Sequence, residues 1–272
     1  MSEQKNATGQ VIKGLLIDID GVLMVENRRI EGSVEAIQYL KENEIPFLLV
    51  TNTTRKSRYG LLSNLRRQGF AVDAGQIFPA AFAAAQWLKG RQIQRIYLLL
   101  RGDAYREFTD FKVTANNPEY LIIGDIGEDL TYDKLNHAFR LVMNGTRMLA
   151  LQKNRYWQRK NGLSIDAGPL IAALEYATGK RAAIIGKPKP EFFKEALKIL
   201  NLKPGETAMI GDDLEADIAG AARVGMYTVA VKTGKYREEQ LQKVKVKPQL
   251  LFSSIADLPD WIEKISSRGA KK

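Results

Sequence analysis

The sequence contains no cysteine and only one histidine, His137, among its 272 residues. Without cysteine, the chain can form neither a disulfide bond nor a thiolate metal site. The single histidine lies beside apolar residues of a predicted helix, where a partly buried or surface position is the common one. Histidine-based catalysis is therefore disfavoured, and any chemistry is expected to depend on other side chains.

Long hydrophobic runs are also missing. No apolar stretch approaches the ~20 residues that a bilayer-spanning helix needs. Residues 1–10 are polar and lack the apolar segment of a signal peptide. We therefore expect a soluble, cytoplasmic protein with no membrane partner. Its hydrophobic content of 45% is that of an ordinary globular chain with room for one large or two smaller domains.

Acidic residues are fewer than basic ones: the chain has 31 Asp and Glu and 41 Lys and Arg, so its formal net charge is +10. A net positive charge can attract nucleic acid, anionic lipid or phosphorylated small molecules. The basic residues are scattered, however, with only mild clusters at 28–29, 66–67 and 268–272. Since no nucleic-acid-binding module is recognisable, we expect most of this charge to lie on solvated surface.

Predicted strands alternate with predicted helices along the chain, which is typical of a parallel sheet covered on both faces. Strands are expected at 11–19, 46–50, 182–185, 207–210 and 227–231, with helices at 32–42, 57–68, 190–200 and 216–224. The middle of the chain repeats the alternation, and its residues 152–161 are expected to form a loop. We predict an α/β fold: a Rossmann-like parallel-sheet core in two parts, 1–79 and 182–272, with an inserted α/β cap domain at 80–181.

Polar side chains follow four of the predicted strands. They are Asp18 and Asp20, Thr51 and Asn52, Lys187, and Asp212 with Asp213. Because ligands of open parallel sheets bind beyond the carboxyl ends of the strands, folding could gather these groups at one edge. Carboxylates are hard ligands for Mg²⁺, lysine neutralises phosphate charge, and hydroxyl and amide groups donate to phosphoryl oxygens. This set suits the binding of a phosphoryl group beside a divalent metal.

The stretch from Asp18 to Gly21 fits such chemistry. Asp18, at the end of its strand, can act as a nucleophile and form an aspartyl-phosphate. Asp20 lies two positions further on, where the period of a strand returns a side chain to the same side. It can protonate the leaving oxygen and then activate the attacking water. Gly21 allows the backbone to turn sharply after the second acid.

These motifs carry a resemblance to a known family. The segments Asp18–Gly21, Thr51–Asn52, Lys187 in Gly-Lys-Pro, and Gly211–Asp217 resemble the four motifs of the haloacid dehalogenase superfamily. The insertion between the second and third motifs resembles the large α/β cap of subfamily IIA, a group of phosphatases. The resemblance spans most of the chain and implies a phosphatase with a closing cap.

The resemblance also implies roles for individual residues. Mg²⁺ would be held by Asp18, by Asp20 through its backbone carbonyl, and by Asp212. Asp213 and Asp217 would orient water, Lys187 or the metal from outside the direct ligands. The residues implied in phosphate binding are Thr51, Asn52, Thr53 and Lys187. Members of this group often pair through their caps, so a homodimer is expected.

Several segments are similar to phospholysine phosphohistidine inorganic pyrophosphate phosphatase and related hydrolase-domain proteins. They are LEYATGK, GKPKPEFFKEAL, MIGDDLEADIAGAARVGM and VKTGKYR. Those animal relatives often have serine where this chain has Asp20, which strengthens the acid–base role of Asp20 and weakens transfer of their nitrogen–phosphorus substrate preference. The sequence leaves the substrate open among small phosphorylated metabolites.

Two alternatives to a phosphohydrolase remain at this point. The first is a phosphotransferase or mutase of the same superfamily, in which an alcohol replaces water as the acceptor. The second is a non-catalytic protein that keeps the fold and binds RNA or acidic partners through its basic surface. The complete set of Asp18, Asp20, Lys187 and Asp212 argues against the second alternative.

Overall fold

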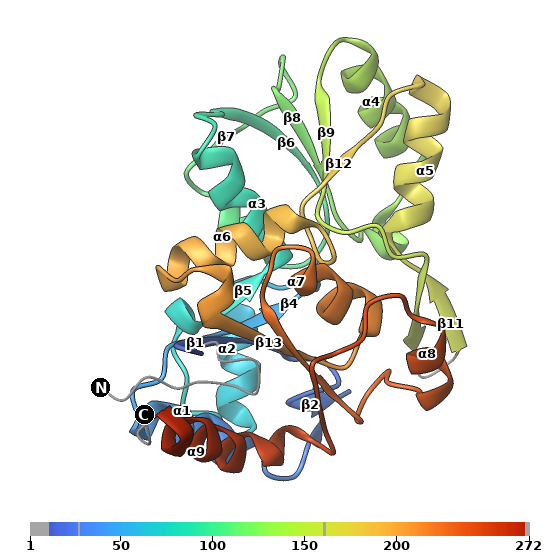
Figure 1. Ribbon diagram of the computed structural model, residues 1–272. Coiled ribbons are helices and arrows are strands. Elements are labelled where there is room, and N and C mark those ends of the chain that lie inside the picture. Colours follow the sequence, from blue (N-terminus) through green and yellow to red (C-terminus); the bar gives the residue numbers. More distant parts are fainter. Residues whose placement is uncertain (1–10, 27, 160–161, 270–272) are drawn as a thin grey trace. The chain divides into compact units, whose positions relative to one another are not determined.

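The computed structural model describes residues 11–26, 28–159 and 162–269 of the chain (Figure 1). Contacts divide the chain into two compact units. Unit 1 comprises Met1–Thr51, Leu61–Phe78 and Phe192–Lys272, and unit 2 comprises Asn52–Gly60 and Pro79–Glu191. Each unit has a parallel sheet of its own.

Unit 1 is built on a six-stranded sheet with the order β15-β14-β13-β1-β4-β5. The strands are β1 (Gly14–Asp18), β4 (Phe47–Thr51), β5 (Ile77–Pro79), β13 (Thr207–Gly211), β14 (Tyr227–Val231) and β15 (Leu250–Phe252). Neighbours from β15 to β4 pair in parallel. Every residue of β1, β4, β13 and β14 is buried, because helices cover both faces of the sheet.

Helices pack on the two faces of this sheet. On one face, Leu15 and Ile17 belong to the same apolar cluster as Leu40 of α1 (Ser33–Glu42) and Ile262 of α9 (Leu258–Gly269). Figure 1 shows α1 and α9 together on this side, with α6 and α7 on the other. The remaining helices that contribute to the unit are α2 (Arg58–Arg67), α6 (Pro190–Leu200), α7 (Gly220–Ala222) and α8 (Glu238–Lys243). A short hairpin, β2 (Met24–Val25) with β3 (Arg28–Arg29), follows β1.

Unit 2 contains a five-stranded parallel sheet with the order β12-β9-β8-β6-β7. The strands are β6 (Arg95–Leu99), β7 (Lys112–Val113), β8 (Tyr120–Ile123), β9 (Arg147–Ala150) and β12 (Ala183–Ile184). Helices α4 (Tyr132–Met143) and α5 (Ala167–Thr178) bury apolar residues on one face. Figure 1 shows α3 (Ala80–Lys89) on the opposite side, where Trp87 meets the ring of Tyr120 edge-on. Both units are therefore α/β, as predicted.

Two local predictions differ from the structure. The strand expected to open the second part of the core is β12, and it pairs with β9 of unit 2, with Ala183 beside Leu149. A strand of two residues carries no signal for which sheet it joins, because its partner is chosen by distant backbone groups. The predicted loop 152–161 contains β10 (Tyr156–Arg159), which pairs antiparallel with β11 (Gly162–Ile165). The basic and polar residues of this segment conceal the alternation of apolar and polar residues that is typical of a strand.

Among the described residues, no helix combines the length and the apolar content that a membrane crossing requires.

Candidate active site

Three neighbouring strands of unit 1 end at residues that the sequence singled out. Asp18 is the last residue of β1, Thr51 is the last residue of β4, and Asp212 directly follows β13. Strand β1 lies between β4 and β13, and its Asp18 is in register with Val50. Because the three strands are parallel, their carboxyl ends meet at one edge of the sheet.

The acids at this edge form a compact buried cluster. Asp18, Asp212 and Asp217 each offer one carboxylate oxygen, and these oxygens lie within 4.8 Å of one another. The three residues are only 7%, 1% and 0% exposed. Buried carboxylates at this separation repel each other unless cationic groups offset their charge. A set of oxygen donors also matches the preference of Mg²⁺, so the residues present fit a divalent cation.

Asp217 reaches this cluster through an unusual helical turn. Asp213 caps the π-helical turn Leu214–Ala219, since its carboxylate accepts the N–H groups of Glu215 at 3.1 Å and Ala216 at 2.9 Å. The N–H of Asp213 donates in turn to Oδ2 of Asp217 at 3.2 Å. The helix predicted at 216–224 therefore begins two residues earlier and as a wider turn. Asp217, predicted only to orient other groups, lies within the cluster itself.

Asp20 lies at the same edge but on the solvent side. Its side chain is exposed, and the hydroxyl of Thr51 donates to its Oδ2 at 3.2 Å. Gly21 has a φ of 89°, and its N–H donates to the carbonyl of Met24 at 2.6 Å. A Cβ on Gly21 would lie 1.9 Å from Oδ2 of Asp212, so a side chain there would collide with the cluster. The turn thus needs glycine for both its conformation and its close approach.

Asn52 and Lys187 are joined within unit 2. The side-chain amide of Asn52 donates to the carbonyl of Lys187 at 2.9 Å, and its Oδ1 accepts the N–H of Lys187 at 2.9 Å. Lys187 is 4% exposed, while Asn52 and Thr53 are partly exposed. These two hydrogen bonds hold the second and third sequence motifs together, although 135 positions separate them.

Lys235 is a residue of this edge that the sequence analysis did not single out. Its N–H donates to Oδ2 of Asp212 at 2.6 Å, and its Nζ lies 3.4 Å from Oδ2 of Asp213. Desolvation lowers the pKa of Lys235, but the charges of Asp213, Asp18 and the other acids outweigh it, and the net pKa is raised. The available signal was the segment VKTGKYR, residues 231–237, which the sequence analysis noted only for its similarity to other hydrolases.

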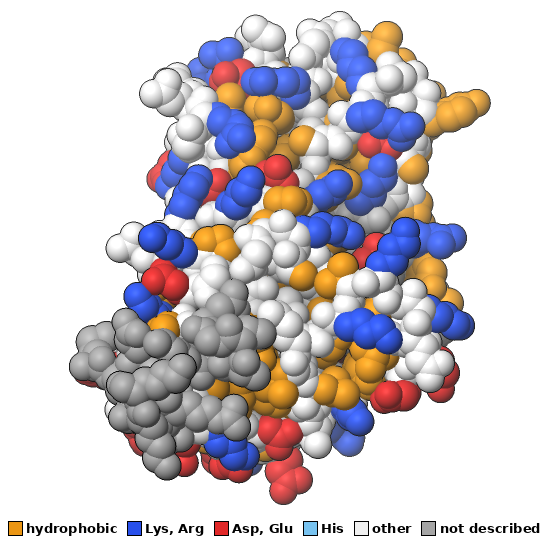
Figure 2. Space-filling view, viewed as in Figure 1, with side chains coloured by type: hydrophobic (Ala, Val, Ile, Leu, Met, Phe, Trp, Pro, Cys, Tyr) orange, Lys and Arg blue, Asp and Glu red, His pale blue; other side chains and the backbone are white. Residues whose placement is uncertain are grey.

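A surface pocket lies beside this edge of the sheet. It has a volume of about 510 Å³ and lies in unit 1, with Asp213, Lys235 and Arg237 among its lining residues. Figure 2 shows Lys and Arg side chains spread among polar and apolar ones on the face in view, without one dominant basic patch. The basic charge on that face is therefore dispersed.

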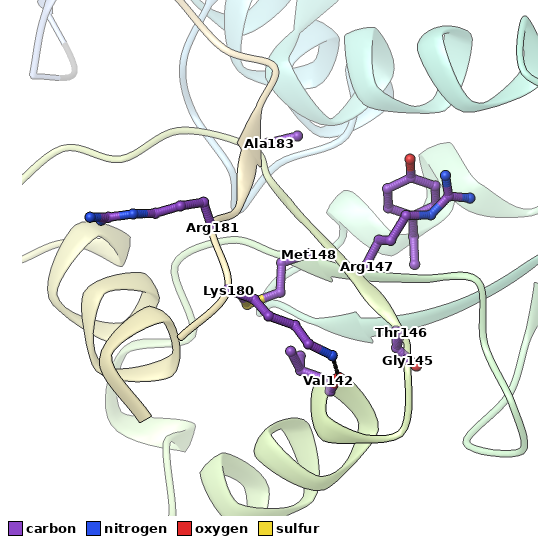
Figure 3. A pocket seen from close by; sticks show the side chains of 9 residues that line it. Val142, Gly145, Thr146, Arg147, Met148, Lys180, Arg181 and Ala183 are labelled. Atoms are coloured by element: carbon purple, nitrogen blue, oxygen red, sulfur yellow. Dashed lines mark hydrogen bonds between the residues drawn. The ribbon is translucent and has the colours of Figure 1, made fainter. Parts of the chain in front are cut away.

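Another pocket, of about 390 Å³, lies on unit 2 (Figure 3). The guanidinium of Arg147 lies over the ring of Tyr120, 4.2 Å from its centroid, and Lys180 Nζ donates to the carbonyl of Val142. Figure 3 shows Arg181 directed away from these two side chains. The basic groups of this pocket do not converge on one point, and none of the predicted site residues lines it.

Comparison with known proteins agrees with this arrangement. Residues 15–114 match the family model of the haloacid dehalogenase-like hydrolases, and residues 184–258 match a second model described as HAD-hydrolase-like. The chain is 38% identical over 257 residues to haloacid dehalogenase-like hydrolase domain-containing protein 2 of Bos taurus, which covers 94% of this chain and 98% of that protein. The chain belongs to the haloacid dehalogenase-like hydrolases.

Three further proteins are also similar to this chain. Phospholysine phosphohistidine inorganic pyrophosphate phosphatase of Homo sapiens is 37% identical over 257 residues, covering 92% of this chain and 94% of that protein. The p-nitrophenyl phosphatase from Archaeoglobus fulgidus has a TM-score of 0.86 at 28% identity, covering 92% and 98% of the two chains. NagD from E. coli K-12 has a TM-score of 0.84 at 26% identity, covering 90% and 98%.

These similarities confirm three predictions. The first is the family, including its subfamily IIA. The second is the Rossmann-like core with an inserted α/β cap. The third is the class of enzyme: this haloacid dehalogenase-like hydrolase is a phosphatase that acts on phosphoric esters. The alternative of a non-catalytic binding protein is thereby disfavoured.

Proposed function

We propose that this phosphatase is a Mg²⁺-dependent phosphohydrolase of small phosphorylated metabolites that works through an aspartyl-phosphate. The observation that carries the proposal is the buried cluster of Asp18, Asp212 and Asp217, whose oxygens lie within 4.8 Å of one another. Asp20 lies two positions after Asp18 and on the exposed side of the same edge. The residues proposed as nucleophile, proton-transfer group and cation ligands thus lie at one edge of the sheet, which supports the proposal.

In the proposed reaction, Asp18 is the nucleophile and Asp20 the general acid and base. The carboxylate of Asp18 attacks phosphorus, the bond to the leaving oxygen breaks, and Asp20 donates its proton to that oxygen. Asp20 then takes a proton from the water that hydrolyses the aspartyl-phosphate and releases inorganic phosphate. The hydrogen bond from Thr51 orients Asp20, and its exposure lets it exchange protons with solvent.

The carboxylates of Asp18 and Asp212, with the backbone carbonyl of Asp20, are the proposed ligands of Mg²⁺. When bound, Mg²⁺ would offset the negative charge of the phosphoryl group and of the carboxylates. Asp213 and Asp217 would keep these groups oriented, a role that the hydrogen bond between Asp213 N–H and Asp217 supports.

Four residues are proposed to bind the phosphoryl group. Thr51 is supported by its place at the end of β4, next to Asp18 on β1. For Asn52, Thr53 and Lys187 the proposal rests on their motifs, and the paired hydrogen bonds between Asn52 and Lys187 support a joint role. Lysine would neutralise phosphate charge, while hydroxyl and amide groups would donate hydrogen bonds.

We also propose that the enzyme works in the cytoplasm, as expected of a chain without cysteine, and that it forms a homodimer through its cap. On the face in view in Figure 2 the basic charge is dispersed, which supports a small phosphorylated substrate in preference to nucleic acid or membrane. The names of similar phosphatases refer to phospholysine, phosphohistidine, pyrophosphate and p-nitrophenyl phosphate, so the substrates tested must cover all four classes.

The proposal is tested by phosphate release from p-nitrophenyl phosphate and a panel of phosphometabolites, with Mg²⁺ and with EDTA. We expect Mg²⁺-dependent release in the wild type and a loss of at least about a thousandfold in Asp18→Asn, because the amide is a poor nucleophile. Asp260→Asn, an exposed position on α9, is the matched control and should keep full activity.

Activity that survives in Asp18→Asn would contradict the aspartyl-phosphate mechanism. Release of less phosphate than of the leaving alcohol, with a phosphorylated acceptor formed instead, would indicate a phosphotransferase or mutase. Salt-sensitive RNA binding without activity on any substrate would favour the non-catalytic alternative.

A further inference from the structure

The loop that follows β14 spans the end of the neighbouring strand. In the sheet, β13 lies between β14 and β1. The hydroxyl of Thr233, two residues beyond the end of β14, nevertheless donates to the carbonyl of Gly21 at 2.5 Å, in the turn that follows β1. The loop therefore crosses the carboxyl end of β13, where Asp212 is located.

Asp212 is enclosed where this crossing occurs. The N–H of Lys235 donates to Oδ2 of Asp212 at 2.6 Å. A Cβ on Gly234 would lie 2.0 Å from the same oxygen, and a Cβ on Gly21 would lie 1.9 Å from it. Two glycines from separate loops thus pack against one carboxylate oxygen, and neither position has room for a side chain.

The glycine at 234 meets a second constraint. Its φ is 60°, in the left-handed region, and its own Cβ would lie 2.5 Å from the Cα of Gly21. The two backbones therefore touch directly. This contact, together with the hydrogen bond from Thr233, ties the loop to the turn that presents Asp20.

We propose that residues 233–235 are a positioning clamp, which holds the carboxylate of Asp212 in the orientation that binds the cation. The inference rests on the metal site of the proposed function. A carboxylate that is already ordered loses less conformational freedom when it binds a cation, so its affinity is higher. Lys235 contributes through its backbone N–H and, near Asp213, places a positive charge beside the cluster.

The clamp is tested by Mg²⁺ affinity, measured by calorimetry on the protein without substrate. Gly234→Ala inserts a methyl group against Asp212, and we expect it to weaken Mg²⁺ binding about tenfold or more. Gly179→Ala is the matched control: Gly179 has a similar φ of 67°, but nothing lies within 4 Å of its added Cβ. Both variants carry the same kind of backbone strain, so only the collision differs.

Thr233→Val provides a second variant in case Gly234→Ala does not fold. It removes the hydroxyl that donates to Gly21 and keeps the shape of the side chain, so we expect Mg²⁺ affinity to fall about two- to tenfold. Circular dichroism establishes that each variant is folded.

Affinities of folded Gly234→Ala or Thr233→Val equal to that of Gly179→Ala would overturn the clamp. A wild type that binds no Mg²⁺ would instead overturn the proposed metal site itself.

Discussion

At the scale of single residues, Glu175 illustrates how hydrogen bonds offset the burial of a charge. This residue of α5 accepts hydrogen bonds from Lys153 Nζ at 2.6 Å and from the N–H of Ala182 at 3.0 Å, and Arg181 lies 3.3 Å away. Burial alone would raise the pKa of Glu175, but these hydrogen bonds and the charge of Lys153 together lower it below its usual value. The carboxylate is therefore more stable in the folded protein than in the unfolded chain.

Glu175→Gln should lower the free energy of unfolding by about 1–2 kcal/mol at pH 7, because Lys153 loses a charged acceptor. A pKa that is lowered on folding contributes stability above the unfolded pKa, and this contribution is lost as the pH falls through the folded pKa. The difference between variant and wild type should therefore shrink below about pH 4.5. Urea unfolding from pH 3 to 8 measures this difference in the free energy of unfolding, with Glu31→Gln at an exposed position as the control. A difference that does not change with pH would contradict this account.

At the scale of elements, the start of α5 depends on one capping side chain. Asp166 accepts the N–H of Ala167 at 2.7 Å and a hydrogen bond from Gln152 at 2.6 Å. Burial raises the pKa of Asp166, and repulsion from Asp125 adds to this, although the hydrogen bonds oppose it. The carboxylate oxygen of Asp166 thus stabilises the start of α5, while its negative charge is destabilising where it is buried.

Asp166→Ala and Asp166→Asn separate these two effects. Asp166→Ala should lower the free energy of unfolding by about 1 kcal/mol, because the first turn loses its acceptor. Asp166→Asn keeps an oxygen and removes the buried charge, so at pH 7 it should be at least as stable as the wild type. A raised folded pKa makes stability fall as the pH rises through the unfolded and then the folded pKa, and the asparagine variant should lack this decrease. Urea unfolding at pH 7 decides: equal destabilisation by both substitutions would refute the capping role.

At the scale of the whole molecule, the proposed homodimer has a candidate surface on the β10–β11 hairpin of unit 2. Tyr156, Leu163 and Ile165 are 56%, 68% and 71% exposed. Tyr156 pairs opposite Ile165, and Leu163 lies two residues before Ile165, so the three side chains share one face of the hairpin. Exposed apolar side chains that gather on one face are typical of an interaction surface.

The double substitution Leu163→Asp with Ile165→Asp should convert the proposed dimer to a monomer, because two charges would be buried without partners. Light scattering after size-exclusion chromatography gives the mass, to be compared with the 30.5 kDa of one chain. Ile199→Asp, at an exposed apolar position on α6, should leave the mass unchanged. A monomeric wild type, or a dimeric double variant, would contradict the assignment.

Much of the fold and of the site follows from local patterns in the sequence. The runs before Asp18 and Thr51 are apolar throughout, and Thr207 is the one polar residue of the strand before Asp212, because strands buried on both faces need no polar side. Polar residues at their ends then meet at one edge, because the strands are parallel. That reasoning requires no knowledge of which helix packs where, and so the α/β class was accessible from the residues alone. The family came from the resemblance of the four motifs to those of known proteins.

The tertiary structure decided the features that depend on distant partners. β12 pairs with β9 because backbone groups of Leu149 and Ala150 are within reach, which no run of two residues can signal. Asp217 enters the acid cluster because a π-helical turn redirects it. Lys235 reaches Asp212 because β14 is adjacent to β13, and strand order is set by the packing of the whole sheet. Local sequence specifies strands and their ends, whereas contacts between distant segments exist only once the chain has folded.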